Sequence, residues 1–173
     1  MPFDLWRNRY NSGDCHVSGS LKAGGTESLP GYALLSQSVL FTETGAGTYT
    51  GTVILPAGSM LVDIIVNGIA VWDAATSASM EVGDATDPDG FFTAIDVKAT
   101  DLLAGESVGL SGGTGVAGGQ VGAYVANSQI NERYSAAART ITGTVVSVGA
   151  GTLGRTLMTV VYSVPTARNA TKV

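Results

Sequence analysis

Hydrophobic and polar residues alternate most clearly in the stretch Thr48–Leu55, TYTGTVIL. Tyr49, Val53 and Leu55 share one parity, while threonines and Ile54 occupy the other. A period of two is typical of a β-strand that buries one face. The stretch therefore predicts a strand with one side in a core.

A second strand is expected directly after a tight turn. Pro56-Ala57-Gly58 fits a type I turn, with proline where its fixed φ is favourable and glycine where the chain leaves. In the arm that follows, Val62, Ile64 and Val66 share a face that excludes Asp63. Thr48–Val66 as a whole thus predicts a β-hairpin.

The rest of the chain has the same character from Ser38 onward. Short segments rich in Val, Ile, Thr and aromatic residues are separated by Gly, Pro, Asp or Asn clusters, which predicts strands and turns. The expected strands are Ser38–Glu43, Thr48–Leu55, Met60–Val66, Ser79–Val82, Phe92–Val97, Ser107–Leu110, Val121–Val125, Thr140–Val148 and Thr156–Val164. Only Asn131–Arg139 could carry a helical turn or two. We therefore predict an all-β fold, a jelly-roll or related two-sheet antiparallel β-sandwich.

One internal similarity supports a two-sheet design. Thr48–Leu55 is echoed by Thr140–Ser147, TITGTVVS, and each copy leads through a glycine-containing turn into a second apolar segment. Two related hairpins would suit a sandwich. A chance match within a Thr- and Gly-rich chain is the alternative.

The first 37 residues lack a steady period and are predicted to form an extended N-terminal arm, with residues 38–173 forming one sandwich domain. A short amphipathic helix over Pro2–Tyr10 is the alternative for its start. Aromatic and basic residues concentrate there, a composition that suits docking on a neighbour. The predicted interaction residues are Phe3, Trp6, Arg7, Arg9 and Tyr10.

Charge is sparse and uneven. Only 13% of the 173 residues are charged and the net charge is −5, which disfavours binding to nucleic acid. Acidic residues dominate Leu61–Glu106 and basic residues dominate the chain from Ser107 onward, so the two regions could meet across a subunit boundary or lie in solvated loops. No uncharged run is typical of a membrane helix and the start lacks a signal-peptide core, so we expect synthesis in a cytoplasm and no membrane partner.

Residues for enzymatic chemistry are few. The single histidine, His16, adjoins the single cysteine, Cys15, and neighbouring side chains point apart in an extended chain, which is poor geometry for a nucleophile and its base. The glycine-rich run Ser111–Gly119 lacks the lysine of a phosphate-binding loop. Asp63 and Asp96 could in principle pair as glycosidase carboxylates, but isolated acids on exposed strand faces are commoner. We predict no enzymatic activity and no cofactor.

One acidic cluster could hold a metal. Asp84, Asp87 and Asp89 precede Gly90 in a way that superficially resembles a calcium loop, although the spacing differs and the distal glutamate is missing. The alternative is an Asp/Pro/Gly turn whose carboxylates cap backbone N–H groups.

Several segments together resemble structural proteins of tailed bacteriophages. They are Leu55–Val66, Ser77–Asp84, Asp87–Phe92, Asp101–Glu106, Arg139–Val145 and Gly154–Tyr162. The resemblance implies a non-enzymatic β-rich virion protein: a capsid decoration, head-fibre, spike-base or tail-associated protein. It also implies the major capsid protein or other virion proteins as partners, a location in the virion, and a homo-oligomer, for which we favour a trimer.

A carbohydrate-binding sandwich of a spike or tail is the alternative function. Sugar recognition needs exposed aromatic rings beside polar groups. Trp72 with Asp73, and Phe91–Phe92 beside Asp89, are the candidate platforms.

Overall fold

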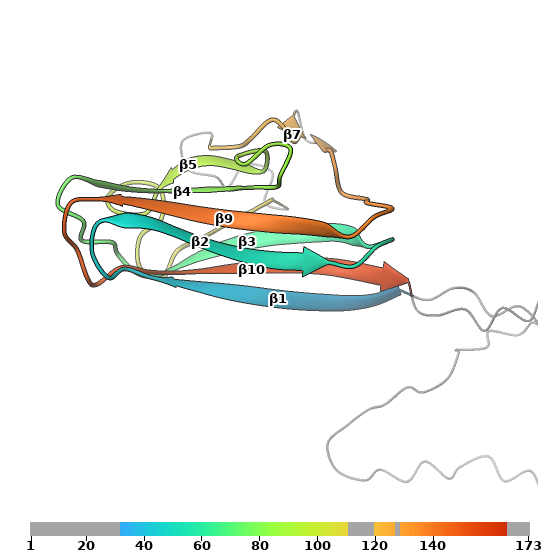
Figure 1. Cartoon of the computed structure of the whole chain (residues 1–173), viewed down its shortest axis with the longest axis horizontal. Coiled ribbons are helices and arrows are strands. Elements are labelled where there is room, and N and C mark those ends of the chain that lie inside the picture. Colours follow the sequence, from blue (N-terminus) through green and yellow to red (C-terminus); the bar gives the residue numbers. More distant parts are fainter. Residues whose placement is uncertain (1–31, 111–119, 127–128, 166–173) are drawn as a thin grey trace, which may run out of the picture. The chain divides into compact units, whose positions relative to one another are not determined.

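The computed structural model describes residues 32–110, 120–126 and 129–165, and its strands form two stacked antiparallel sheets (Figure 1). The first sheet has the order β1-β10-β3-β6 and the second β2-β9-β4-β5. The first comprises β1 (Tyr32–Thr42), β10 (Arg155–Pro165), β3 (Met60–Ala70) and β6 (Ser107–Gly109). The second comprises β2 (Gly47–Leu55), β9 (Arg139–Val148), β4 (Ser77–Gly83) and β5 (Phe92–Asp96). A small ribbon pairs β7 (Val125–Ala126) with β8 (Gln129–Ile130).

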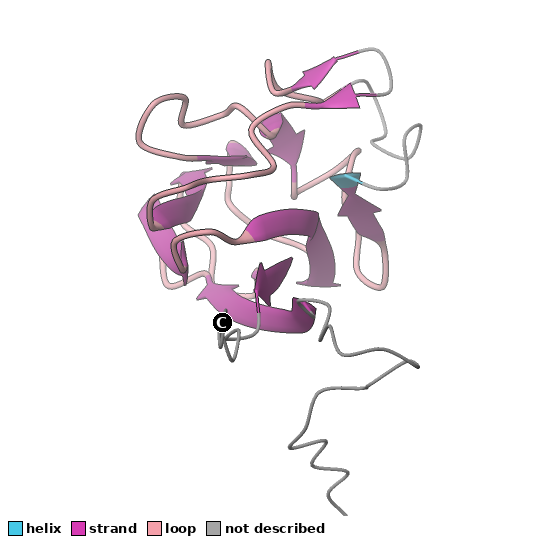
Figure 2. Cartoon of the chain, turned by 90° about the vertical axis from the view of Figure 1, so that its right-hand side faces the viewer, coloured by secondary structure: helices cyan, strands magenta, loops and turns pink. Residues whose placement is uncertain are grey.

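The predicted all-β sandwich is confirmed. Figure 2 views the strands from one end, with strands and loops making up nearly all of the described chain. The strand order is compatible with the jelly-roll variant, which stays a prediction. Within the described residues, no helix is long and apolar enough to cross a membrane.

The predicted hairpin at Thr48–Val66 is wrong, because its two strands lie in different sheets. β2 pairs with β9, whereas β3 pairs with β10, so the turn at Pro56–Gly58 carries the chain from one sheet to the other. Gly58 has a φ of 75°, which explains the glycine at this position. Alternation predicted the buried faces but carried no information about the partner strand.

The buried parity is confirmed in β2 and shifts in β3. Val53 and Leu55 are buried as predicted, and so are Ile64 and Val66. The register of β3 against β10 shifts at Val161/Tyr162, so Leu61 enters the core in place of Val62, which is half-buried. A bulge of this kind adds one residue to a strand and reverses its facing beyond that point.

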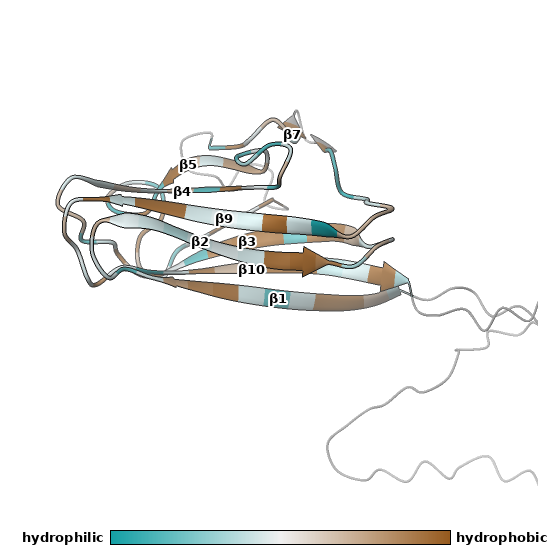
Figure 3. Ribbon diagram, viewed as in Figure 1, coloured by the Kyte–Doolittle hydropathy of each residue, from teal (hydrophilic) through white to brown (hydrophobic). Residues whose placement is uncertain are grey.

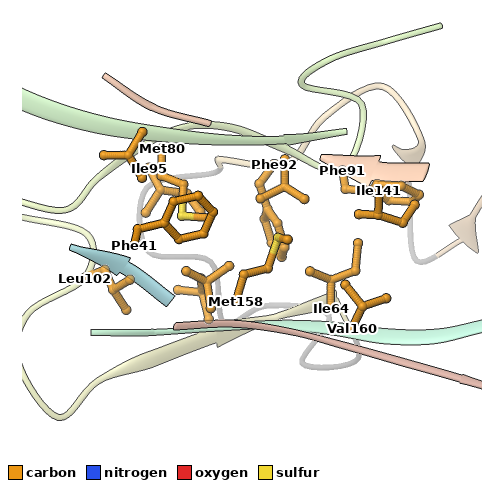
Figure 4. Close-up of a cluster of buried hydrophobic side chains, with 14 of the residues drawn as sticks. Phe41, Ile64, Met80, Phe91, Phe92, Ile95, Leu102, Ile141, Met158 and Val160 are labelled. Atoms are coloured by element: carbon orange, nitrogen blue, oxygen red, sulfur yellow. The ribbon is translucent and has the colours of Figure 1, made fainter. Parts of the chain in front are cut away.

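The two similar TGT stretches lie side by side. β2 and β9 pair so that Gly51 faces Gly143. A Cβ on Gly51 would lie 3.0 Å from the Phe41 ring, and one on Gly143 would lie 2.9 Å from it. The glycine pair therefore leaves the space in which Phe41, carried by the opposite sheet, packs beside Met80 and Met158 (Figure 4).

Several strand boundaries differ from those predicted: β3 extends to Ala70, β4 begins at Ser77, and the expected strand Val121–Val125 is wrong, because β7 begins only at Val125. β1 begins at Tyr32, six residues before the expected start at Ser38, because polar side chains from Ser36 to Ser38 hid the strand. The expected helical turn at Asn131–Arg139 is instead an irregular connection that leads into β9. Glu132 in this connection has a φ of 55°, which a helix does not allow.

Candidate interaction surfaces

The predicted arm residues Phe3, Trp6, Arg7, Arg9 and Tyr10 lie outside the described residues. The same holds for Cys15, His16 and the glycine-rich run Ser111–Gly119. The role of the arm therefore stays a prediction. The described sandwich has five features that bear on function: the aspartate loop, a buried glutamate, the predicted aromatic platforms, two strand acids, and the two side edges.

The aspartate loop contains Asp84, Asp87 and Asp89. Both carboxylate oxygens of Asp84 accept contacts from donors of the same chain. Its Oδ1 accepts hydrogen bonds from the backbone N–H groups of Thr86 and Asp87 at 2.9 and 3.0 Å, and from the Tyr124 hydroxyl at 3.1 Å. Its Oδ2 lies 2.8 Å from Arg139 Nε and 2.6 Å from Arg139 Nη2. These are the capped turn and ion pair of a structural carboxylate.

Arg139 joins this loop to the connection that precedes β9. Its guanidinium carbon lies 5.2 Å from the centre of the Phe91 ring and 5.6 Å from that of Tyr124. The two rings meet edge to face at 5.1 Å. Arg139 also donates to the carbonyl of Glu132. The Arg139 guanidinium thus links the start of β9 to the loop that follows β4 and to the loop around Tyr124.

The pKa values of the acidic loop reflect this arrangement. Burial would raise the pKa of Asp84, but the N–H groups of Asp87 and Thr86 and the Arg139 guanidinium outweigh it and lower the pKa below its ordinary value. The pKa of Asp87 is raised, chiefly by its hydrogen bond to the Asp89 side chain. Burial, followed by the hydrogen bond to Asp84, raises the pKa of Tyr124.

A metal ion gains no support from this geometry. In residues 32–110, 120–126 and 129–165, no three His, Cys, Asp or Glu side chains come together as ligands. Calcium binding by Asp84, Asp87 and Asp89 stays a prediction, and Asp84 already has donors on both oxygens.

A second carboxylate, Glu43, is buried at the opposite end of β9. Its Oε1 accepts a hydrogen bond from Ser147 Oγ at 2.9 Å. Its Oε2 accepts from the N–H groups of Asp73 and Gly154 at 3.1 and 3.0 Å. Glu43 therefore links the end of β1 to the segments that contain Asp73, Ser147 and Gly154. The sequence did not reveal this structural role.

The aromatic platforms predicted for sugar binding are inside the core. Trp72 is 1% exposed, donates to Thr156 Oγ1 at 2.9 Å, and meets Tyr49 edge to face at 5.2 Å. Phe91 and Phe92 are completely buried. The prediction that these rings form a carbohydrate platform is wrong, because each of them fills the space between the sheets.

Asp63 and Asp96, the pair not favoured as glycosidase carboxylates, each hold a backbone N–H group. Asp63 Oδ1 accepts the N–H of Leu110 at 2.9 Å. Asp96 Oδ1 accepts the N–H groups of Lys98 and Ala99 at 2.8 and 2.9 Å. Both carboxylates thus act as acceptors that fix neighbouring backbone.

One side edge of the sandwich, formed by β5 and β6, is short and covered. β5 is five residues long, contains Ala94 at a φ of 35°, and shifts register against β4. The segment beyond the glycine-rich run lies along it: Phe92 pairs with Val121, and Thr93 donates its N–H to the Gln120 carbonyl at 3.2 Å. β6 is only three residues long.

The other side edge, formed by β1 and β2, is long and open as far as the described residues go, since none of them pairs with its outer side. Each is the last strand of its sheet, with 11 and 9 residues respectively. Neither contains a charged residue or a proline, and the pairing of β1 with β10 runs without a register shift. Apolar side chains are exposed along this edge, among them Tyr32 (63%), Leu34 (66%), Leu40 (53%) and Ile54 (62%). Figure 3 shows brown and pale colours along most of both strands.

Comparison with known proteins shows that this chain is similar to solved structures in its fold. No protein-family model and no curated protein matches the sequence. A chain in the acidic stable capsid structure of Helicobacter pylori bacteriophage KHP30 matches with a TM-score of 0.53 and 14% identity, covering 80% of this chain and 95% of that one. Chains in the cyanophage Pam1 capsid asymmetric unit and the capsid of Ralstonia phage GP4 match with TM-scores of 0.45 and 0.47, at 20% and 17% identity. They cover 92% and 85% of this chain, and 100% and 93% of their own. At such identities the KHP30 likeness establishes a shared fold.

Besides Glu43, two features of the site were missed from the sequence. Arg139 and Asp84 are 55 positions apart, and the only signal was the acidic middle and basic end of the chain, which here meet within one chain. Nothing in the local pattern around β1 marked it as an open edge, because that property depends on which strands pair.

Proposed function

We propose that this chain is a non-enzymatic structural protein of a tailed-phage virion, a capsid decoration or a head-fibre or spike-base protein. The observation that carries the proposal is the surface of the sandwich. The long edge strands β1 and β2 present uncharged and apolar side chains, a composition suited to lasting contact with other proteins.

The polar groups of the described sandwich support the same conclusion. The carboxylates of Glu43, Asp73 and Asp84 each accept at least two hydrogen bonds from their own chain. Groups engaged in this way stabilise loops. The fold likeness to a chain of the KHP30 capsid adds support for assembly into a virion, with the major capsid protein or other virion proteins as partners.

Attachment is assigned in this proposal to the N-terminal arm. Phe3, Trp6 and Tyr10 supply aromatic anchors, and Arg7 and Arg9 supply donors that can pair with carboxylates. The sandwich would then project from, or lie on, the surface to which the arm is bound.

Co-sedimentation with phage particles from which this protein has been deleted tests the proposal. We expect the full chain to pellet with the particles, and a variant with Phe3, Trp6 and Tyr10 changed to alanine to lose binding at least tenfold. Tyr134→Ala is the matched control, since Tyr134 is an exposed aromatic residue of the sandwich. A full chain that stays in the supernatant contradicts the virion role. Equal binding by the arm variant contradicts the role of the arm.

A further inference from the structure

The strand β1 combines properties that folded proteins usually avoid at a sheet edge. Exposed edges invite pairing with other chains, and they are commonly blunted by charges, prolines, bulges, short length or a covering segment. The β5–β6 edge has the short strands, the register shift and the cover. β1 has no charge, proline or register shift over its 11 residues, and no segment among residues 32–110, 120–126 and 129–165 pairs with its outer side. The contrast within one domain indicates that a partner occupies the β1 edge.

The sequence of β1 identifies that partner. YALLSQSVLFT is a chemical palindrome centred on Gln37. When the strand is laid antiparallel to a copy of itself with Gln37 facing Gln37, serine faces serine, the three pairs beyond are apolar, and the outermost pair brings two hydroxyl-bearing side chains together. The facing pairs are Ser36 with Ser38, Leu35 with Val39, Leu34 with Leu40, Ala33 with Phe41, and Tyr32 with Thr42.

We propose that two copies of this chain associate through β1, related by a twofold axis at Gln37, so that their β1-β10-β3-β6 sheets join into one continuous sheet. Antiparallel addition of a strand satisfies the open backbone groups of both copies. A twofold contact brings the same patch from each subunit together, so the patch must be self-complementary. The palindrome gives β1 that property.

Charge favours a second copy over other occupants. The net charge is −5, and the acidic loops near β5 would repel their own copies, whereas β1 and β2 carry no charge. The chain's own arm is a poorer match, because its longest uncharged run before β1 begins, Cys15–Leu21, is shorter than β1. This inference does not depend on the virion role. It favours an even-numbered assembly over the trimer predicted from the sequence.

Paired charge variants of the full chain test the register directly. In the proposed pairing residue 36 of one copy faces residue 38 of the other. Ser36→Lys with Ser38→Lys places like charges opposite each other, whereas Ser36→Lys with Ser38→Glu places opposite charges there. Both variants lose the same exposed hydrogen bond between the hydroxyl groups of Ser38 and Thr159, so they are matched.

Sedimentation equilibrium provides the readout. We expect a dimer for the unchanged chain and for the Lys/Glu variant, and a dissociation constant raised roughly tenfold or more for the Lys/Lys variant. A monomeric or trimeric unchanged chain overturns the proposal, and so does an equal dissociation constant for the two variants.

Hydrogen exchange on the unchanged chain keeps the test decisive if a variant fails to fold. Amides of β1 should exchange more slowly at high than at low protein concentration, while those of β5 should not change with concentration. Exchange in β1 that is independent of concentration overturns the proposal.

Discussion

The edge formed by β5 and β6 and the edge formed by β1 and β2 close the same sandwich in different ways. At the first, short strands are covered by the segment around Gly122, which donates its N–H to the Phe91 carbonyl at 3.0 Å. The cover is held by Tyr124, whose hydroxyl bonds to Asp84. At the second, long regular strands end each sheet with uncharged side chains.

Under the proposed pairing of β1, the difference is one between an edge that the chain covers itself and an edge that a second copy completes. The β5 edge is covered by a segment of the same chain. That segment is held in place by the Arg139–Asp84 ion pair, the rings of Phe91 and Tyr124, and Gly122. An edge that is completed by a partner needs only a regular strand and side chains that match those of the partner. The four predictions below test each half of this contrast, from the largest expected effect to the smallest.

Gly122→Ala should remove the cover of the β5 edge. A Cβ at this position would lie 2.0 Å from the backbone oxygen of Asp89, which cannot move without displacing the turn. We expect a loss of about 3 kcal/mol in the free energy of unfolding, measured by urea titration. Amides of β5 should exchange faster with solvent. Ala123→Ser, at an exposed neighbouring position, is the control, and equal stability of the two variants would contradict the role of Gly122.

Asp84→Asn should weaken the same edge through its ion pair. Arg139 would keep its charge next to Phe91 and Tyr124 without a carboxylate to neutralise it. The Asp84 and Arg139 side chains are 12% and 11% exposed, so we expect a loss of about 2 kcal/mol, between the values for exposed and fully buried pairs. Asp87→Asn is the control and should not destabilise, because the pKa of Asp87 is already raised by Asp89.

The pH dependence of stability should report the same carboxylate. Because the pKa of Asp84 is lowered from 3.8 on folding, its contribution is present above pH 3.8 and is lost as the pH falls through the folded-state pKa. The difference in unfolding free energy between the unchanged chain and Asp84→Asn should therefore shrink below about pH 4. A difference that stays constant down to acidic pH would show that the charge of Asp84 contributes nothing.

Leu34→Ser should leave the folded monomer almost unchanged, although it lies on the open edge. Leu34 is 66% exposed, so the free energy of unfolding should change by less than about 0.5 kcal/mol at concentrations where the chain is monomeric. Self-association should nevertheless weaken, because Leu34 faces Leu40 in the proposed pairing. Leu153→Ser, at a loop residue with 64% exposure, should leave self-association as it is.

The sequence predicted which faces are buried better than it predicted which strands are neighbours. Alternation placed Val53, Leu55 and Ile64 in the core because burial depends on the local period of two. It produced a hairpin where there is a crossing between sheets, because pairing depends on distant strands. Val62 was misplaced since a bulge is decided by the fit of β3 to β10.

The site was predictable only in part for the same reason. The turn at Asp84 could be anticipated from its Asp, Pro and Gly residues, but its partner Arg139 comes from a strand far along the chain. Glu43 gave no signal, since its donors come from three separate segments. The palindrome in β1 was visible in the sequence, yet it acquires meaning only once β1 is known to end its sheet.

Disulfide trapping at Gln37 tests the central claim most directly. With Cys15 changed to serine, Gln37→Cys places two thiols opposite each other at the twofold axis, where facing Cα atoms of an antiparallel pair lie about 5 Å apart. Ser36→Cys is the control. Residue 36 of one copy faces residue 38 of the other, so the two introduced cysteines would lie diagonally, with Cα atoms about 8 Å apart, too far for a disulfide. We predict oxidation to a covalent dimer for Gln37→Cys and not for Ser36→Cys. Equal trapping of the two variants, or no trapping of Gln37→Cys, would contradict the pairing of β1 with itself.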